Sequence, residues 1–285
     1  MRLLVTGAAG QLGVDVVAHA RSVGDDVIGV AKADLDITDV DAVRELLEAQ
    51  RPDAVINAAA YTAVDACETN ESLAFAVNAD AVGHLSASCE VVGAHLVHVS
   101  TDYVFDGTLD RPYRENDATN PQSVYGRSKL AGEQAAGSGA SIARTSWVCG
   151  EHGNNMVKLV LRLAGDPEQA LAFVDDQRGK PTFTADLAPA VRRLAVDRRA
   201  GVFHVTNQQP VSWFEFVREI LAVAGHDPDR VRPIATADLD PPRPAPRPAN
   251  SVLDDVAWRA AGYEPLRNFR EPLAELVTTL RRDEV

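Results

Sequence analysis

The sequence predicts an α/β fold of the Rossmann-like, doubly wound type: a parallel sheet covered on both faces by helices, with a smaller C-terminal lobe. Short apolar strands alternate with amphipathic helices through the first half of the chain, and a glycine-rich turn joins the first strand to the first helix. Beyond about residue 150 this alternation becomes irregular. We therefore expect a sheet domain over residues 1–150, which also receives later segments, and a lobe formed mainly by residues 151–285.

The expected elements follow the chain in order. Leu3-Leu4-Val5 is a short apolar run that leads directly into the glycine turn, so it is predicted as the first strand. A helix over 14–22 and a second strand over 27–30 follow. Asp39 is a residue type that caps helix N-termini, which predicts a helix from there to Leu47. The later strands are expected over 54–57, 95–100 and 141–144, and the later helices over 74–92 and from Pro121 onward.

The composition is that of a globular protein with a full core: 285 residues, 46% hydrophobic and 24% charged. A formal net charge of -13 argues against non-specific nucleic-acid binding, because that mode of binding needs a basic surface. The sequence has neither the pattern of a secretory signal nor an apolar run long enough to span a membrane. We therefore expect a cytoplasmic protein that binds neither nucleic acid nor membrane.

Cysteine and histidine spacing predicts no metal site. Cys67, Cys89 and Cys149 lie far apart without a CxxC pair, and we expect them to be reduced, buried thiols. His95 and His98 are three apart on a predicted strand, so their side chains point to opposite faces. Since no HExxH motif or Cys/His cluster occurs either, catalytic zinc is not expected.

A phosphate-binding turn is predicted at the N-terminus. Gly7, Gly10 and Gly13 stand three apart between a strand and a helix, where glycine permits a tight turn and lets main-chain N–H groups approach a pyrophosphate. The spacing differs from the GxGxxG of the standard dinucleotide fingerprint. The alternative, a glycine-rich turn without a ligand, is disfavoured by the strand before it and the helix after it. The sheet domain is thus predicted to bind a nicotinamide dinucleotide.

A proton-transfer pair is predicted at Tyr125 and Lys129. Four positions apart on a helix, the phenol and the ammonium face the same way. A free tyrosine has a pKa of about 10, and we expect the ammonium, with an oxidised nicotinamide, to lower the pKa of the phenol toward the range of a general acid. A packed aromatic beside a surface lysine is the alternative, and the glycine motif argues against it.

Hydroxyl and carboxyl groups follow the predicted strand 95–100. Thr101 and Asp102 stand at the carboxyl end of that strand, where ligands bind in open α/β folds. A hydroxyl there is placed to hydrogen-bond a substrate carbonyl and to orient it toward Tyr125. The alternative for Thr101 is a turn or helix-capping hydroxyl.

The end of the second predicted strand bears on cofactor choice. This strand ends in Val30-Ala31-Lys32, and Lys32 stands in place of the acid that favours NAD. A lysine at this position suits the 2′-phosphate of NADP. The alternative is that Lys32 is a solvated surface lysine. NADP(H) is thus favoured and NAD(H) possible. Asp36 and Ile37 are candidates for the adenine edge. Small residues after the third strand, up to Ala60-Tyr61-Thr62, let a flat cofactor lie close.

The segment 241–248 alternates proline with arginine. It has the composition of a polyproline ligand for another domain, but its arginines also suit a diphosphate. We favour the second interpretation because Asn250-Ser251 and a predicted helix follow immediately.

Segments along nearly the whole chain resemble the dTDP-4-dehydrorhamnose reductases, which are extended short-chain dehydrogenase/reductases. The segments are TGAAGQLG, NAAAYTAVDACE, VNAD, HVSTDYVFDG, PQSVYGRSKLAGEQ, RTSWV, DDQRGKPT and RPAPRPANSVLD. The resemblance implies NAD(P)H-dependent reduction of the 4-keto group of dTDP-4-dehydro-L-rhamnose to dTDP-L-rhamnose. Two alternatives remain open: a nucleotide-sugar epimerase or dehydratase on the same scaffold, and a non-catalytic regulatory subunit of the methionine adenosyltransferase type.

The resemblance also implies roles for individual residues. The catalytic set would be Thr101, Tyr125 and Lys129, with Asp102 and Trp147 near the sugar and Arg247 facing the diphosphate. The cofactor would be lined by Gly7, Gly10, Gln11, Leu12, Gly13, Asp36, Ile37, Ala60, Tyr61 and Thr62, besides Tyr125 and Lys129.

Oligomeric state is the last expectation. Some relatives are described as dimers joined through acid-bound magnesium. Asp15 has the chemistry for one such ligand, but Ala185 stands near where another acid would fall. We therefore expect a monomer or a homodimer that is not linked by magnesium.

Overall fold

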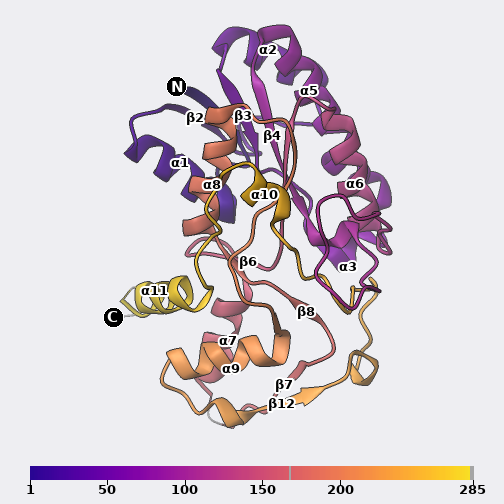
Figure 1. The fold of residues 1–285 in the computed structure, drawn as a ribbon, viewed down its shortest axis with the longest axis vertical. Helices are drawn as coiled ribbons and strands as arrows, with labels where there is room; N and C mark the ends of the chain where they lie inside the picture. The colour runs from indigo at the N-terminus through magenta and orange to yellow at the C-terminus, as the bar shows by residue number, and fades with distance from the viewer. Residues whose placement is uncertain (167, 283–285) are drawn as a thin grey trace.

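The computed structural model describes residues 1–166 and 168–282, and within them a six-stranded parallel sheet forms the centre of the molecule (Figure 1). The strand order is β10-β5-β4-β3-β1-β2, which is a doubly wound arrangement. The strands are β1 (Arg2–Thr6), β2 (Asp26–Val30), β3 (Ala54–Asn57), β4 (His95–Thr101), β5 (Ser141–Thr145) and β10 (Gly201–His204). The predicted α/β fold class is confirmed.

Helices cover both faces of this sheet. On one face α1 (Gln11–Ser22) packs against α8 (Thr184–Asp197), and on the other α2 (Val40–Gln50), α5 (Ala81–Val92) and α6 (Val124–Ala136) lie side by side (Figure 1). Successive strand residues serve alternate faces: Leu3 and Val5 join the core beside α1 and α8, whereas Leu4 joins the core beside α2 and α5. Because both faces are covered, the strands are continuously apolar rather than alternating.

Several predicted boundaries need correction. The first helix begins at Gln11, earlier than predicted, because Gly10 is its N-cap residue. The helix that carries Tyr125 begins at Val124 and not at Pro121, since the Ser123 hydroxyl accepts a hydrogen bond from Gly126 N and caps the helix there. The helix from Asp39 is confirmed, with the Asp39 carboxylate accepting from two main-chain N–H groups.

The helix predicted over 74–92 is a composite. It consists of α4 (Glu71–Phe75), a π-helical segment η1 (Ala76–Asp80) and α5. The wider turn of a π-helix shifts the side chains that follow it around the helix axis, and such segments are frequent at functional sites. Asn78 lies in η1, and its contacts matter for the site described below.

A second apolar cluster is built from the later part of the chain and lies below the sheet in Figure 1. Helices α7 (Met156–Ala164), α9 (Trp213–Val223) and α11 (Arg270–Arg282) pack with the parallel pair β7 (Leu171–Val174) and β12 (Val231–Ile234). Phe216 and Phe269 lie fully buried at its centre. Three later segments, α8, β10 and α10 (Val256–Ala260), return to the sheet, where Trp258 joins the core.

The remaining elements are short. Two-residue strands pair as β6 (Val148–Cys149) with β9 (Thr182–Phe183) and as β8 (Arg178–Gly179) with β11 (Val211–Ser212). The short helices are α3 (Val64–Cys67), η2 (Asp102–Val104), η3 (Pro228–Arg230) and η4 (Thr236–Asp238). Cys67, Cys89 and Cys149 are free and buried, as predicted. Across the described part of the chain, none of the helices has the length and apolar character needed to cross a membrane.

Truncating Leu194 of α8 tests the core on the α1–α8 face. Leu194 is fully buried, so Leu194→Ala is expected to lower the free energy of unfolding by about 3 kcal/mol through lost burial and the cavity left behind. Val196 of the same helix is 42% exposed, and Val196→Ala should change that free energy by less than about 0.5 kcal/mol. Urea denaturation measures both. Equal losses in the two variants would contradict the described packing of α8.

Candidate active site

The glycine turn brings three segments into close main-chain contact. Gly7 has φ +68°, and a side chain there would meet Ala59 N at 2.7 Å; a Cβ at Gly13 would lie 2.1 Å from Gly7 O. Only glycine therefore allows α1, the turn and the segment after β3 to pack this closely. Gly10 makes no side-chain cap at the N-terminus of α1, so the first-turn N–H groups remain available to an anion.

A cavity of about 610 Å³ opens beside this turn, at the carboxyl ends of β1, β3, β4 and β5. The sequence-predicted residues that line it are Gly10, Gln11, Leu12, Ala60, Thr62, Thr101, Asp102, Tyr125, Lys129 and Trp147. The other predicted residues, Gly7, Gly13, Lys32, Asp36, Ile37, Tyr61 and Arg247, lie outside this lining. The structure thus brings the glycine turn and the Thr101–Tyr125–Lys129 set to one cavity.

Thr101 and Tyr125 meet at the wall of this cavity. Thr101 ends β4; its hydroxyl donates to Asp102 Oδ1 at 3.0 Å and accepts from Tyr103 N at 3.2 Å. The Thr101 hydroxyl also acts on the Tyr125 phenol, whose pKa it tends to lower. Burial outweighs that effect and raises the pKa of Tyr125 above its ordinary value. The predicted lowering of the phenol's pKa involves a bound oxidised nicotinamide and stays a prediction.

The Lys129 ammonium is held against β4. Its Nζ donates to Val99 O at 2.7 Å and lies 3.3 Å from His98 Nε2, so its recorded partners belong to β4 rather than to the phenol. Burial lowers the pKa of Lys129 to about 8, while the charge of Glu133 acts in the other direction. Lys129 is 2% exposed, so its amino group is a desolvated group at the cavity wall and not a surface cation.

Burial also acts on the Asp102 carboxyl. It raises the pKa of Asp102 to about 6, against the opposing effect of the hydrogen bond that Thr101 donates to Oδ1. Within the described part of the chain, Asp102 Oδ2 is buried and has no hydrogen-bond partner. The carboxyl of Asp102 therefore takes up a proton at a higher pH than the carboxyl of an exposed aspartate does.

Two asparagines support the site, and the sequence analysis assigned a role to neither. Asn78 of η1 accepts from Tyr61 N at 2.8 Å and donates to Tyr61 O at 3.0 Å and to Ser128 Oγ at 3.0 Å. It thereby ties the segment after β3 to α6. Asn57, at the end of β3, accepts from Thr6 and from Ala59 N. Asparagine inside an apolar helical run is disfavoured unless its side chain is used, and VNAD carried that signal.

A buried ion pair fixes α6 to the sheet. Arg144 of β5 donates to both carboxylate oxygens of Glu133, at 2.9 and 2.7 Å, and Ser100 of β4 donates to Glu133 at 2.5 Å. The Arg144 and Glu133 side chains are 5% and 6% exposed. A bidentate pair with an added hydroxyl donor holds one helix against two strands, one turn beyond Lys129.

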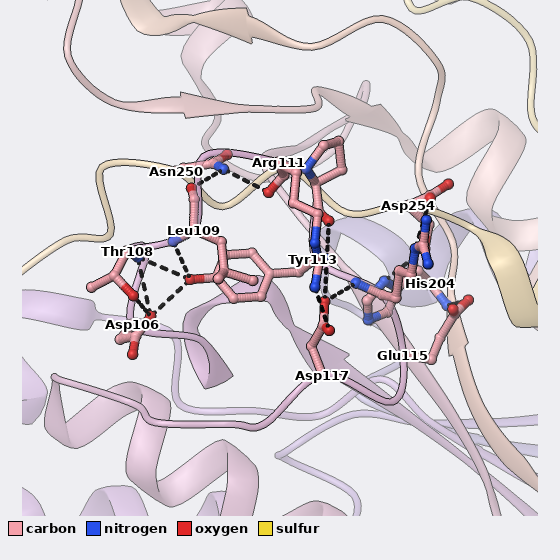
Figure 2. Close-up of polar contacts among 12 residues, drawn as sticks. Asp106, Thr108, Leu109, Arg111, Tyr113, Glu115, Asp117, His204, Asn250 and Asp254 are labelled. Atoms are coloured by element: carbon pink, nitrogen blue, oxygen red, sulfur yellow. Dashed lines mark hydrogen bonds and ion pairs between the residues drawn. The ribbon is translucent and has the colours of Figure 1, made fainter.

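The loop that follows β4 is held against the C-terminal part of the chain (Figure 2). The Tyr113 hydroxyl donates to Asp106 and accepts from the main-chain N–H groups of Thr108 and Leu109, and Asn250 donates to the carbonyls of Leu109 and Arg111. On the other side of Tyr113, the imidazole Nδ1 of His204 on β10 contacts Asp254 O. The main-chain N–H of His204 donates to the Glu115 carboxylate. This network ties the loop after β4 to β10 and to the segment around Asn250 and Asp254.

A second cavity, of about 340 Å³, shares Tyr103 and Trp213 with the first. Arg247 lines it, but its guanidinium is already paired: two nitrogens donate to the two oxygens of Asp65 at 2.9 and 2.8 Å. Arg243 lies 3.7 Å from the same carboxylate. Two arginines and one aspartate leave this cluster with one net positive charge.

Trp147 is held in a strained backbone conformation between the two cavities. Its φ is +48°, a value that non-glycine residues rarely adopt. Its indole stacks on Trp213 at 3.5 Å between ring centroids, and a Cβ on Gly179 would lie 2.5 Å from it. The strain is therefore supported by tight contacts on two sides.

The residues predicted near the adenosine follow β2 and lie outside the lining of the first cavity. Lys32 and Asp36 are exposed, and the Thr38 hydroxyl and N–H hold the pKa of Asp36 below its usual range. Ile37 packs in the core beside α2. Asp34, which the sequence analysis did not select, accepts from Ala31 N at 2.9 Å in the turn after β2.

Asp15 and Ala185 line one further cavity, together with Glu151 and Glu275. Among the residues that the structure describes, no group of three or more His, Cys, Asp or Glu side chains is arranged to hold a metal ion.

Comparisons with known proteins agree with one another. The family model described as "RmlD substrate binding domain" matches residues 1–282. A dTDP-4-dehydrorhamnose reductase of Mycobacterium tuberculosis is 46% identical over 282 residues, covering 96% of this chain and 91% of that protein. A dTDP-4-keto-6-deoxy-D-glucose reductase of Streptomyces niveus is 41% identical, with 99% of each chain covered.

Solved structures give the same picture. A dTDP-4-dehydrorhamnose reductase of Clostridium acetobutylicum superposes with a TM-score of 0.94 at 40% identity, covering 99% of this chain and all of that one. One from Bacillus anthracis, in complex with NADP, has a TM-score of 0.93 at 35% identity, with 98% and 99% covered.

Gly132 of α6 provides a test of the site's framework. A Cβ at Gly132 would lie 2.0 Å from Asn78 O, so Gly132→Ala is expected to push α6 away from η1. This displacement should lower the free energy of unfolding by about 2 kcal/mol and weaken dinucleotide binding. At Gly83 of α5 a Cβ meets nothing closer than Ala135 at 3.7 Å, and Gly83→Ala should stabilise the protein by up to about 1 kcal/mol. Thermal unfolding and NADPH fluorescence titration measure both; a harmless Gly132→Ala would refute the close contact.

Proposed function

Because the chain belongs to the RmlD substrate-binding-domain family, that of the dTDP-4-dehydrorhamnose reductases, we propose that it reduces the 4-keto group of dTDP-4-dehydro-L-rhamnose to dTDP-L-rhamnose. By this membership the protein is an NAD(P)H-dependent oxidoreductase. The observation that carries the proposal is the single cavity that Thr101, Tyr125 and the N-terminus of α1 share. It offers a proton donor and an anion-binding helix end within one space.

The residues present fit a nicotinamide dinucleotide. The glycine cradle would be filled by a Cβ at Gly7 or Gly13, and the uncapped first turn of α1 suits a pyrophosphate. When bound, the reduced cofactor supplies hydride to C4 of the sugar. Gly10, Gln11 and Leu12 would hold the pyrophosphate end, and Ala60 and Thr62 the nicotinamide side.

The chain's own residues supply the proton and the orientation. The Thr101 hydroxyl turns its one hydrogen from Asp102 to the carbonyl oxygen and holds that oxygen in line with Tyr125. As hydride arrives at C4, negative charge develops on that oxygen, and Tyr125 gives it the phenolic proton. The raised pKa of Tyr125 keeps the phenol protonated before this step, which is the state that a reductase requires.

The second cavity supports a place for the nucleotide. Tyr103, Phe173 and Trp213 offer aromatic surface, and the Arg243–Arg247–Asp65 cluster offers net positive charge to a diphosphate. Trp147 and Asp102, which line the first cavity, would then border the sugar between the two sites. The 151–285 part of the chain would act mainly as the substrate-binding lobe.

NADP(H) is the proposed cofactor, with NAD(H) as a poorer one. Lys32 is exposed and follows β2 directly, where a 2′-phosphate would lie. The carboxylate of Asp34 is engaged by Ala31 N in the same turn. A reductase structure at 35% identity contains NADP, which supports this choice.

The reaction itself is tested by following NADPH absorbance on addition of dTDP-4-dehydro-L-rhamnose. We expect stoichiometric oxidation, and a fall in kcat of at least about 100-fold in Tyr125→Phe, because the general acid is lost while the ring is kept. NADPH binding by the variant, followed by fluorescence, serves as the control. Cofactor bound without net oxidation by the wild-type protein would refute the reductase and favour an epimerase, a dehydratase or a regulatory subunit.

Charge reversal at Lys32 tests the cofactor preference. Lys32→Glu should reduce the ratio of kcat/KM for NADPH over NADH by about fivefold or more, because an exposed ion pair to the 2′-phosphate is replaced by repulsion. Arg44→Glu makes the same charge change on the exposed surface of α2 and should leave the ratio unaltered. An unchanged ratio in Lys32→Glu would assign Lys32 to the solvated surface.

A further inference from the structure

A chain of buried polar side chains runs from the cavity wall across the sheet. Lys129 of α6 lies 3.3 Å from His98 Nε2 on β4, His98 Nδ1 lies 3.1 Å from Asn57 Nδ2 on β3, and Thr6 of β1 donates to Asn57 Oδ1 at 2.7 Å. Thr6, Asn57 and His98 are fully buried. Among these groups only Lys129 borders the cavity, so the other three act on catalysis through it.

The orientation of the Asn57 amide is fixed by the main chain. Ala59 N donates to Asn57 Oδ1 at 3.2 Å, and a main-chain N–H has no alternative role. Turning the amide over would set its NH₂ group against that N–H. The amide nitrogen of Asn57 therefore faces His98 Nδ1 and donates to it.

This donation determines the tautomer of His98. Because Nδ1 accepts from Asn57, the ring hydrogen of the neutral imidazole is on Nε2. An imidazolium would place an Nδ1–H against the Asn57 NH₂ group, and burial together with the nearby Lys129 holds the pKa of His98 well below its usual range. The Nε2–H consequently points at the nitrogen of Lys129.

An ammonium has only N–H groups to offer to that Nε2–H, so the two donors oppose each other; an uncharged amine has a lone pair that accepts it. We infer that His98, oriented by Asn57, is a positioning residue that stabilises the uncharged form of Lys129. The Asn57–His98 pair thus favours loss of a proton from the Lys129 ammonium.

The other groups around Lys129 do not cancel this effect. Val99 O accepts a hydrogen bond from the nitrogen in either charge state. Glu133, one turn along α6, favours the ammonium, but its oxygens are held by Arg144 and Ser100. Burial lowers the pKa of Lys129 to about 8, and the inferred effect of His98 acts in the same direction. Gly132 contributes space, since a Cβ there would lie 3.3 Å from His98 Nε2.

The consequence for turnover rests on the proposed function. Tyr125 loses its proton in each reduction and must be protonated again. Lys129 lines the same cavity as Tyr125 and lies one helical turn from it on α6, so in this scheme its ammonium supplies that proton and becomes the amine bonded to His98. The amine of Lys129 then takes a proton from solvent. Each reduced sugar therefore consumes one solvent proton, and both side chains return to their starting protonation states.

The tautomer is tested directly in the protein without cofactor. A long-range proton–nitrogen correlation spectrum of the imidazole rings, assigned through bonds from the wild-type backbone, distinguishes Nε2–H from Nδ1–H and from the cation. We expect Nε2–H for His98 at neutral pH. An Nδ1–H tautomer or an imidazolium would overturn the inference, and this outcome depends neither on a variant nor on any activity.

The coupling is tested by titrating the Lys129 side chain through its carbon-13 shifts. His98→Asn keeps an oxygen for Asn57 but removes the N–H that faces Lys129, so the Lys129 midpoint should rise by about one pH unit, a tenfold change in proton affinity. If His98 instead accepted from the ammonium, the midpoint would fall. His95→Asn alters the other buried histidine of β4, which contacts Ser141, and should leave the midpoint unchanged.

The activity arm separates this inference from the proposed function. In the wild type the alkaline limb of the kcat profile for sugar reduction should follow the Lys129 midpoint, and in His98→Asn both should move upward together. A shifted midpoint with an unmoved limb would overturn the proton-supply role of Lys129. A protein that reduces no nucleotide sugar would refute the proposed function and leave the NMR result standing.

Discussion

The contact between α6 and the segments it covers is the constraint on which the site depends. Tyr125 and Lys129 are useful only if their helix lies close to the end of β4, and that closeness is made by several different interactions. Gly132 removes a side chain where Asn78 O approaches, Ser123 sets the first residue of the helix, and the Glu133–Arg144 pair anchors the helix to β5. Each of them limits where the phenol lies relative to Thr101.

Burial then determines the electrostatics of the site more than net charge does. The chain carries a net charge of -13, yet the wall of the cavity combines a lysine with a lowered pKa, an aspartate with a raised pKa and a tyrosine with a raised pKa. All three shifts have burial as their largest cause, and all three favour the uncharged form. A site of this kind holds its protons until a substrate brings developing charge to it.

The sequence predicted the sheet, the glycine turn and the Tyr125–Lys129 pair because each has a local signal: apolar runs, a spacing of three, and a spacing of four on a helix. It did not predict Asn57, Asn78 or His98 as supports, because their partners are distant in the chain: Asn57 contacts residues 6 and 98, and Asn78 contacts residues 61 and 128. The expected effect of Lys129 on the phenol rests on spacing alone and stays a prediction. Helical spacing places two side chains on one face, but only the fold shows that a carbonyl of β4 holds the ammonium.

The stacked pair of Trp147 and Trp213 has an optical consequence. Trp147 follows β5 of the sheet, whereas Trp213 begins α9 of the second apolar cluster, and their rings are nearly parallel, at 8°. Indoles in such contact couple electronically, so we expect the pair to contribute a circular-dichroism band that is lost when the two parts of the chain separate. Trp258, the third tryptophan, lies in the core of the sheet and contributes a separate signal. The signal of the stacked pair would report whether the sheet and the second apolar cluster are in contact at Trp147 and Trp213.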